Sequence, residues 1–276
     1  MGHEESRIAW HPAFVEAIQL ELKEYRDSLE FIPEFQLTSE PLKIECVIVK
    51  KTKDAVIKKN IAAIFREANL IEYKSPDDYV SVADFNKVYA YAYLYSSFNK
   101  IPISNLTISF IESHYPRELL AYLSETRGFK VEENQAGIYT ISGDALPIQF
   151  VDSRKLPVEE NLWLKGLNKR LDPLEIIKIS EEVRRLEKTA RVQAYMDAIA
   201  KANYHAIEEA MSMSEPARSL DEVLERTGLA ARWEARGIEK GIETVARNAL
   251  AEGLSIESVS RITGFDVETL QVIRDK

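Results

Sequence analysis

The sequence is poor in the residues that build disulfide-bonded and zinc-binding proteins. Cys46 is the only cysteine among 276 residues, so no intrachain disulfide can form. The four histidines are scattered, and none of them has a second histidine at the spacing of zinc ligands on a helix. A chain with so little cysteine is typical of a reducing compartment, and we expect a cytoplasmic protein.

Long apolar runs and glycine-rich loops are also missing. No stretch approaches the roughly 20 apolar residues that span a bilayer, so we expect no membrane partner. The first residues, Met-Gly-His-Glu-Glu-Ser-Arg, lack the apolar region of a signal peptide. With only 10 glycines, the chain has no glycine-rich phosphate loop of the kind that nucleotide hydrolases use.

The composition is that of a globular protein, with 45% hydrophobic and 29% charged residues. A net charge of −9 argues against non-specific nucleic-acid binding by the surface as a whole. Between Leu42 and Lys74, however, eight cations face four anions: Lys43, Lys50, Lys51, Lys53, Lys58, Lys59, Arg66 and Lys74 against Glu45, Asp54, Glu67 and Glu72. This segment is either a solvated face or a phosphate-facing patch around an acidic site.

Helical and strand patterns alternate through the first part of the chain. Apolar residues at helical spacing predict a first helix over residues 14–28. Ser81 and Asp84 have the spacing of a capping box at the start of another helix. The remaining periodicities predict strands over 42–51, 70–74, 105–112 and 147–151, a hairpin within 129–141, and helices over 54–66, 81–95 and 117–126.

Strand patterns disappear after about residue 158. The sequence then predicts a long helical stretch over 173–211, helices over 220–227 and 229–250, and a terminal helix–turn–helix-like element. We therefore expect two domains, residues 1–160 and 161–276. Because the last helix carries several acids, it is poorly suited to reading DNA, and packing or self-association is the better interpretation.

One strand carries a pair of residues suited to phosphodiester chemistry. Glu72 and Lys74 are two residues apart, so they share one face of their strand. Glu45 lies on an upstream strand. Carboxylates on rigid strands can hold Mg²⁺ through oxygen ligands, and a nearby lysine can orient water or offset negative charge on a phosphate. A Glu-x-Lys triplet is common, however, and an exposed ion-paired strand is the plain alternative.

Several longer segments of the sequence are informative beyond that triplet. Segments 21–27, 41–51, 64–78 and 84–95, with Ala-Arg-Asn-Ala-Leu-Ala-Glu-Gly-Leu-Ser-Ile-Glu near the end, resemble the PD-(D/E)xK nuclease superfamily. More narrowly, they are similar to the bacterial Rpn-like group, described as recombination-promoting nucleases or PD-(D/E)xK transposase-like proteins. The resemblance covers roughly residues 10–115 and, less closely, the C-terminal tail.

This resemblance implies a fold, an activity and a set of site residues. The fold is α/β, a restriction-endonuclease-like mixed sheet flanked by helices, with an all-α C-terminal region. The activity is that of a Mg²⁺-dependent (or Mn²⁺-dependent) DNA endonuclease linked to recombination or mobile elements. By resemblance, Glu45 and Glu72 are the metal ligands and Lys74 is the catalytic lysine, while Glu21 and Lys87 are auxiliary residues.

Glu45 departs from the family pattern, which usually has aspartate at this position. Glutamate is one methylene longer, and Mg²⁺ prefers near-octahedral coordination. The departure leaves open an alternative function, a catalytically degenerate scaffold that mediates protein–protein interaction. We expect DNA as the partner of the active nuclease and a homodimer formed through the C-terminal helices.

Overall fold

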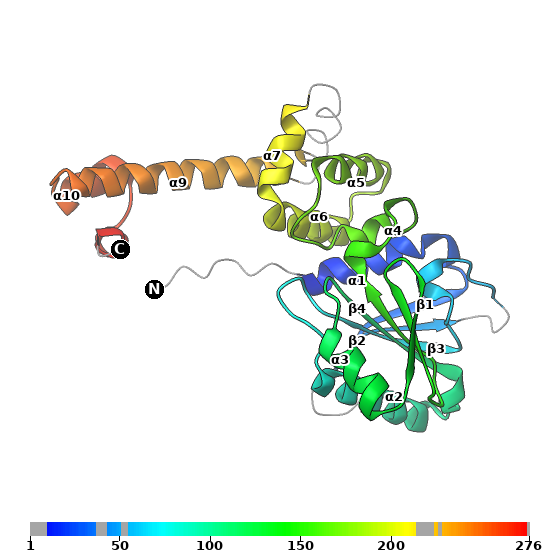
Figure 1. The fold of residues 1–276 in the computed structure, drawn as a ribbon. Helices are drawn as coiled ribbons and strands as arrows, with labels where there is room; N and C mark the ends of the chain where they lie inside the picture. The colour runs from blue at the N-terminus through cyan, green and yellow to red at the C-terminus, as the bar shows by residue number, and fades with distance from the viewer. Residues whose placement is uncertain (1–9, 37–42, 51–54, 214–223, 226–227, 275–276) are drawn as a thin grey trace. The chain divides into compact units, whose positions relative to one another are not determined.

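The computed structural model describes residues 10–36, 43–50, 55–213, 224–225 and 228–274, which fall into two compact units, Met1–Leu220 and Asp221–Lys276. The first unit is a mixed α/β structure (Figure 1). Its helices are α1 (Trp10–Glu21), α2 (Val82–Asn99), α3 (Arg117–Ala121), α4 (Val158–Lys165), α5 (Pro173–Arg185), α6 (Ala190–Ala202) and α7 (Tyr204–Ser212). Its strands are β1 (Leu29–Gln36), β2 (Lys43–Lys50), β3 (Ala68–Tyr73), β4 (Leu106–Glu112), β5 (Lys130–Gln135), β6 (Ile138–Ser142) and β7 (Ile148–Asp152).

The seven strands form one sheet in the order β1-β2-β3-β4-β7-β6-β5. β1, β2 and β3 are antiparallel neighbours, and β7, β6 and β5 are antiparallel at the other side. Between them, β3, β4 and β7 are parallel. Because parallel neighbours need a crossover, α2 connects β3 to β4. The carboxyl ends of β3, β4 and β7 therefore meet at one edge, where ligands commonly bind in open α/β sheets.

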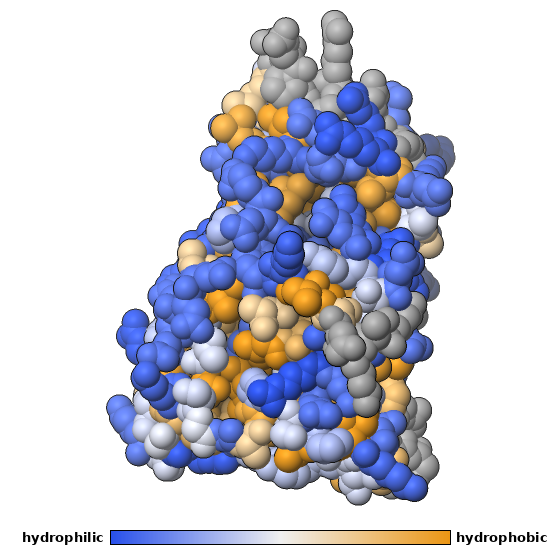
Figure 2. All heavy atoms as spheres, turned by 90° about the vertical axis from the view of Figure 1, so that its right-hand side faces the viewer, coloured by the Kyte–Doolittle hydropathy of each residue, from blue (hydrophilic) through white to orange (hydrophobic). Residues whose placement is uncertain are grey.

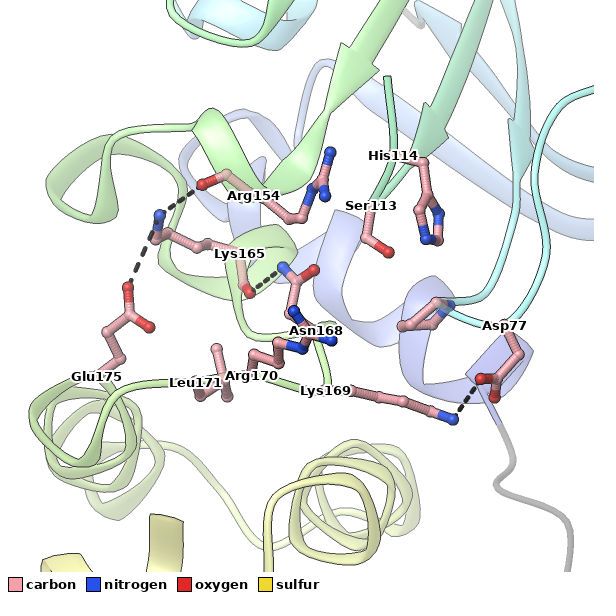
Figure 3. Close-up of a pocket in the computed structure, with 11 residues that line it drawn as sticks. Asp77, Ser113, His114, Arg154, Lys165, Asn168, Lys169, Arg170, Leu171 and Glu175 are labelled. Carbon is pink, nitrogen blue, oxygen red and sulfur yellow. Dashed lines mark hydrogen bonds and ion pairs between the residues drawn. The ribbon is translucent and has the colours of Figure 1, made fainter. Parts of the chain in front are cut away.

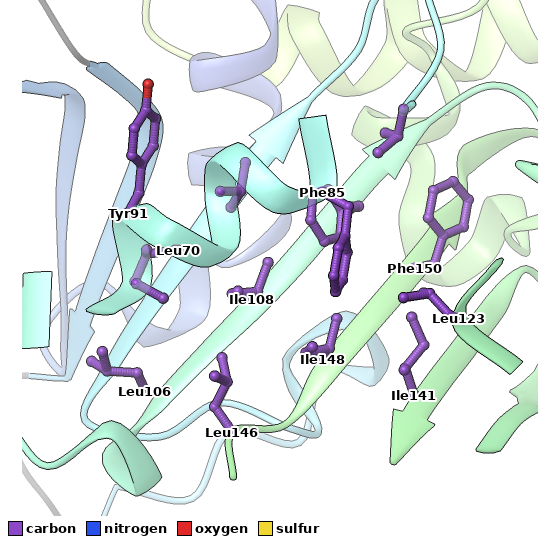
Figure 4. Packing of buried hydrophobic residues seen from close by; sticks show 14 of the residues in the cluster. Leu70, Phe85, Tyr91, Leu106, Ile108, Leu123, Ile141, Leu146, Ile148 and Phe150 are labelled. Carbon is purple, nitrogen blue, oxygen red and sulfur yellow. The ribbon is translucent and has the colours of Figure 1, made fainter. Parts of the chain in front are cut away.

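Helix α2 covers one face of the sheet. Leu70, Ile108 and Ile148 lie side by side on the three parallel strands and pack with Phe85 of α2 in one buried cluster (Figure 4). Because side chains alternate along a strand, the residues two positions farther on point to this same face. This face is apolar in its centre and becomes acidic towards the carboxyl ends of the strands.

Helix α1 lies on the opposite face of the sheet. The ring of Phe14 stacks on that of Tyr73 with centroids 4.4 Å apart. Helices α4 and α6 pack against α1, and Tyr195 of α6 donates a hydrogen bond to the Trp163 carbonyl at 2.8 Å. Helices α4 to α7 thus belong to the same compact unit as the sheet.

The helix predicted over residues 54–66 is wrong for the part that the structure describes. Residues 55–59 have no regular structure, and only a short 3₁₀ turn, Asn60–Ala62, follows. The Ile61 carbonyl accepts from Gln149 Nε2 at 2.6 Å, and Asn60 pairs with Asn161 through both of its side-chain polar atoms. These tertiary hydrogen bonds replace those of a helix, although the apolar residues keep helical spacing.

The predicted helical stretch over 173–211 is three helices, α5, α6 and α7. The breaks fall at polar residues that bond elsewhere. Thr189 caps α6 by accepting from the Val192 amide, and Asn203 bonds the backbone of Asn168 and Leu171. The helix expected over 220–227 lies mostly outside the described residues.

Other predicted elements are confirmed, with ends that differ by up to seven residues. The first helix begins at Trp10, four residues earlier than predicted, and ends at Glu21, seven residues earlier than predicted. The helix over 117–126 consists of α3 and one π turn, and the predicted hairpin is β5–β6. The capping box is present, because Ser81 Oγ accepts from the Asp84 amide while Asp84 accepts from the Ser81 amide.

The second unit contains α9 (Leu229–Ala251), α10 (Ile256–Thr263) and α11 (Val267–Arg274). Gly264 ends α10 with φ of 77°, a left-handed conformation that glycine adopts without strain. Ala246, Val259, Leu270 and Ile273 form a small core of their own. Helix α10, Gly264 and α11 follow one another in the predicted order of helix, turn and helix.

The surface mixes residue types. Figure 2 shows hydrophilic residues over most of one face, with hydrophobic ones in separate groups among them. Such a mixture is ordinary for a folded chain. Across the described part of the chain, no helix is both long enough and apolar enough to span a bilayer.

Candidate functional site

Glu45 and Glu72 lie on neighbouring antiparallel strands. Cys46 of β2 pairs with Ile71 of β3, and extending this register by one pair sets Glu45 opposite Glu72. Opposed residues in an antiparallel pair point to the same face, which here is the face covered by α2. The two carboxylates predicted as metal ligands therefore lie side by side.

Lys74 lies one residue beyond the end of β3, next to Glu72. Its backbone amide donates to the Ile111 carbonyl at 2.9 Å, which extends the β3–β4 pairing. Its Nζ is 2.9 Å from Asp84 Oδ1, 3.5 Å from Asp78 Oδ2 and 4.0 Å from Glu72 Oε1. The Lys74 side chain, 14% exposed, thus reaches three carboxylates, one in β3, one in the following turn and one at the start of α2.

The charges around Lys74 keep it protonated. Burial alone would lower the pKa of the Lys74 ammonium, but the hydrogen bond and charge of Asp84, with Asp78 and Glu72, raise it above its ordinary value. Lys74 is therefore suited to orient water or offset negative charge, and unsuited to act as a base.

Lys87 of α2 completes an alternating group of charges. Its Nζ lies 3.4 Å from Glu72 Oε1 and 3.5 Å from Asp84 Oδ1. Burial raises the pKa of the Glu72 carboxyl, and the nearby charge of Glu45 raises it further, while Lys87 and Lys74 lower it. We call Glu45, Glu72, Lys74, Asp84 and Lys87 the charged cluster.

Asp84 joins the helix cap to the charged cluster. Its Oδ2 accepts from Ser81, and its Oδ1 accepts from Lys74. Burial would raise the pKa of Asp84, but these hydrogen bonds outweigh it and lower the pKa to about 2. The sequence predicts Asp84 as a capping residue, and its contact with Lys74 depends on the tertiary structure.

His11 of α1 contacts the charged cluster at Glu45. Its Nδ1 is 2.8 Å from Glu45 Oε2, and this hydrogen bond raises the pKa of the imidazole despite partial burial. Glu45 is thus hydrogen-bonded to His11 through Oε2, and its charge also raises the pKa of Glu72. The sequence offers no signal for His11, because its partner is 34 residues away.

Two further acids lie at the same strand ends and were not predicted. Glu112 of β4 pairs in register with Asp152 of β7, one row beyond Phe110 and Phe150. Glu112 Oε2 accepts from the Val80 amide at 2.7 Å, and Asp152 accepts from Arg154. Burial raises the pKa of Glu112 to about 7. The alternating pattern of β4 was the available signal, because it sets Glu112 on the same face as Ile108.

Glu21 does not join the charged cluster. Its Oε1 accepts from the backbone amides of Trp163 and Leu164, and its Oε2 pairs with Lys59 at 2.8 Å. It joins α1 to α4, and we interpret it as a structural residue. Of the two residues predicted as auxiliary, Lys87 contacts Glu72 and Glu21 does not.

The basic segment between residues 42 and 74 is only partly free to meet a phosphate. Lys43 pairs with Glu34, Lys59 pairs with Glu21, and Arg66 donates to the Ser104 carbonyl. Lys51 and Lys53 lie outside the described residues. Among the described cations, Lys74 and Lys87 are therefore the ones that contact the carboxylates of the charged cluster.

The charged cluster offers oxygen ligands only, from Glu45 and Glu72. Throughout the described part of the chain, no group of three or more His, Cys, Asp or Glu side chains is arranged as a metal site. Comparison of this chain with protein-family models, with characterised proteins and with solved structures finds no match.

Proposed function

We propose that this protein is a metal-dependent endonuclease that hydrolyses phosphodiester bonds in DNA. The observation that carries the proposal is the charged cluster itself. Lys74 directly follows β3 and its Nζ lies 4.0 Å from Glu72 Oε1, Glu45 lies beside Glu72 on β2, and the group sits at the carboxyl end of β3. The resemblance to the PD-(D/E)xK superfamily assigns chemistry to the same three residues.

The donor set fits a hard divalent cation. Mg²⁺ is usually bound through one or two carboxylates, with water and substrate phosphate completing its coordination, so Glu45 and Glu72 suffice as protein ligands. When bound there, Mg²⁺ or Mn²⁺ would supply positive charge that stabilises negative charge developing on the phosphate. Relief of the charge repulsion between half-buried Glu45 and buried Glu72 also favours a cation at this place.

The other residues of the cluster position the reacting groups. Lys74 donates to oxygen atoms from a fixed direction, because Asp84 and Asp78 hold its ammonium. His11 holds Glu45 through Oε2. Lys87, whose side chain is 43% exposed, is the cation best placed to contact a phosphate from solvent.

Incubation of supercoiled plasmid DNA with Mg²⁺ or Mn²⁺ tests the proposal. We expect Lys74→Ala to slow cleavage by about 10²-fold or more, the effect of losing a positioned donor to a developing charge. Lys178→Ala is the matched control, because Lys178 is half-exposed in α5 and pairs with Glu159 outside the cluster. Chelation with EDTA abolishes cleavage. Equal cleavage by Lys74→Ala and the wild type contradicts the proposal.

A second candidate function rests on the same contacts. Every carboxylate of the cluster already has a cation or His11 as partner, so the group can be a structural ion-pair network in a catalytically degenerate scaffold. In the second unit, Ile238 and Val245 are exposed seven residues apart on α9, which favours a homodimer through the C-terminal helices. This function predicts no cleavage by the wild type and a dimer by light scattering.

A further inference from the structure

A polar pocket of 560 Å³ lies beyond the carboxyl ends of the parallel strands. Its volume is within the usual range for a ligand site. Three strand ends contribute to it, with Asp77 after β3, Ser113 and His114 after β4, and Arg154 after β7. Figure 3 shows Asp77, Ser113 and His114 across the pocket from Asn168, Lys169 and Arg170, which follow α4.

Positive charge exceeds negative charge in this pocket. Arg154, Lys165, Lys169 and Arg170 line it, against Asp77 and Glu175, so the lining has an excess of two positive charges. Lys169 pairs with Asp77, and Lys165 lies 3.7 Å from Glu175. Arg170 is exposed and has no hydrogen bond or ion pair within the described structure. Its guanidinium is therefore available to a ligand.

An imidazole and a hydroxyl also line the pocket. The Nδ1 atom of His114 is buried and has no hydrogen-bond partner among the described residues. Ser113, next to it, is 5% exposed and also lines the pocket. A buried polar atom without a partner is uncommon in folded proteins and calls for an explanation. A guanidinium, an imidazole and a hydroxyl together match the oxygen acceptors of a phosphate group.

The pocket adjoins the charged cluster through the same strand ends. Asp77 is three residues beyond Lys74, and the next residue, Asp78, pairs with Lys74. Ser113 directly follows Glu112, and Arg154 pairs with Asp152, the neighbour of Glu112 in register. A nucleic-acid strand that lies across the ends of these β-strands would therefore pass from one site to the other.

We propose that this pocket binds a phosphate group of a nucleic-acid strand, at a nucleotide that flanks the bond hydrolysed at the charged cluster. The affinity for phosphate follows from Arg170, His114 and Ser113. The assignment of that phosphate to a nucleic-acid strand rests on the proposed nuclease function.

Binding without divalent metal tests the pocket separately from cleavage. The probes are a fluorescein-labelled single-stranded oligodeoxynucleotide, followed by fluorescence anisotropy in EDTA, and inorganic phosphate, followed by calorimetry. We expect Arg170→Ala to weaken binding of both probes by about tenfold, the loss of one charge-assisted contact. The salt dependence of oligonucleotide binding should fall by about one phosphate contact. Arg185→Ala is the matched control, because exposed Arg185 lies in α5 outside the pocket and pairs only with Glu182 in the described structure.

Each outcome decides a separate point. Unchanged binding of both probes by Arg170→Ala, or equal losses with Arg185→Ala, overturns the pocket. Weaker binding of phosphate with unchanged oligonucleotide binding overturns its assignment to a nucleic-acid strand. If the wild type cleaves no DNA in Mg²⁺ and Arg170→Ala still weakens oligonucleotide binding, the proposed catalysis fails and the binding pocket stands.

Discussion

At the residue scale, Asp84 has two roles that a single substitution can expose. It accepts from the Ser81 amide in the helix cap and from Lys74 in the charged cluster. Since its pKa in the folded protein is lowered from 3.8 to about 2, the stability that its charge provides is present above pH 3.8 and is lost as pH falls through about 2.

We therefore expect Asp84→Asn to be less stable than the wild type at neutral pH. The difference in free energy of unfolding should be constant down to about pH 4 and disappear as pH approaches 2. Urea unfolding at a series of pH values measures it. A difference that persists unchanged at pH 2 contradicts the role of the Asp84 charge.

Glu112 shows the opposite dependence on pH. Burial raises its pKa from 4.5 to about 7, with added effects from Asp152 and Asp78 that Lys74 and the Val80 amide oppose. The folded state thus holds a proton that the unfolded state releases, and this contribution to stability is lost as pH rises through about 7.

We expect Glu112→Gln to remove this dependence, because glutamine still accepts from the Val80 amide and carries no charge. Above pH 7 the variant should be more stable than the wild type, by up to about 3 kcal/mol. Thermal unfolding between pH 5 and 8 gives both profiles. Parallel profiles for the two proteins contradict the raised pKa, and Glu112→Ala controls for loss of the acceptor.

The site residues that could be predicted from the sequence are those that belong to a local pattern. Glu72 and Lys74 share a face by the period of a strand, and Ser81 and Asp84 form a cap by their spacing. His11 could not be predicted in this way, since its contact with Glu45 arises only when α1 is packed on the sheet.

At the element scale, the start of α2 holds the charged cluster together. Asp84 and Lys87 lie in its first turns, and Ser81 caps it. Loss of an N-cap usually costs about 1 kcal/mol. Because the same turn orients the partners of Lys74, weakening this cap should also affect the site.

We expect Ser81→Ala to lose about 1 kcal/mol in free energy of unfolding and to slow DNA cleavage several-fold. Thr189→Ala is the control, because Thr189 caps α6 with a similar hydrogen bond and lies outside the charged cluster. The control should lose similar stability and cleave at the wild-type rate. Equal slowing by both variants would mean that cleavage depends on general stability alone.

Element types were predicted best where apolar spacing and burial agree. β3, β4 and β7 lie where their sequence patterns predict strands. Their position in the parallel centre of the sheet buries both of their faces. Residues 55–66 have apolar residues at helical spacing without a helix, because Asn60 and the Ile61 carbonyl bond to Asn161 and Gln149. Such long-range hydrogen bonds leave no trace in local periodicity.

At the scale of the whole molecule, the two compact units carry different features. The first holds the charged cluster and the pocket proposed to bind phosphate, which is lined by residues that follow β3, β4 and β7. The second has its own small core and the exposed residues of α9. The strand-bearing part of the sequence ends near residue 158, and the compact unit continues to Leu220 because α4 and α6 pack against α1.

Substitutions at two buried glutamates of the first unit can distinguish the proposed catalytic role from a structural one. Glu72 is 4% exposed and belongs to the charged cluster, whereas Glu21 is 6% exposed and joins α1 to α4. Replacing either glutamate by glutamine keeps the size and the acceptor oxygen of the side chain and removes its charge. Of these two glutamates, only Glu72 is proposed to hold a metal.

The rate of plasmid cleavage in Mg²⁺ by Glu72→Gln and Glu21→Gln is the most direct test of the nuclease assignment. We predict that Glu72→Gln loses at least about 10²-fold in rate, because one of two metal ligands is gone, while Glu21→Gln cleaves within a few-fold of the wild type. Wild-type cleavage by a folded Glu72→Gln, or an equal loss in Glu21→Gln, would contradict the assignment of the site.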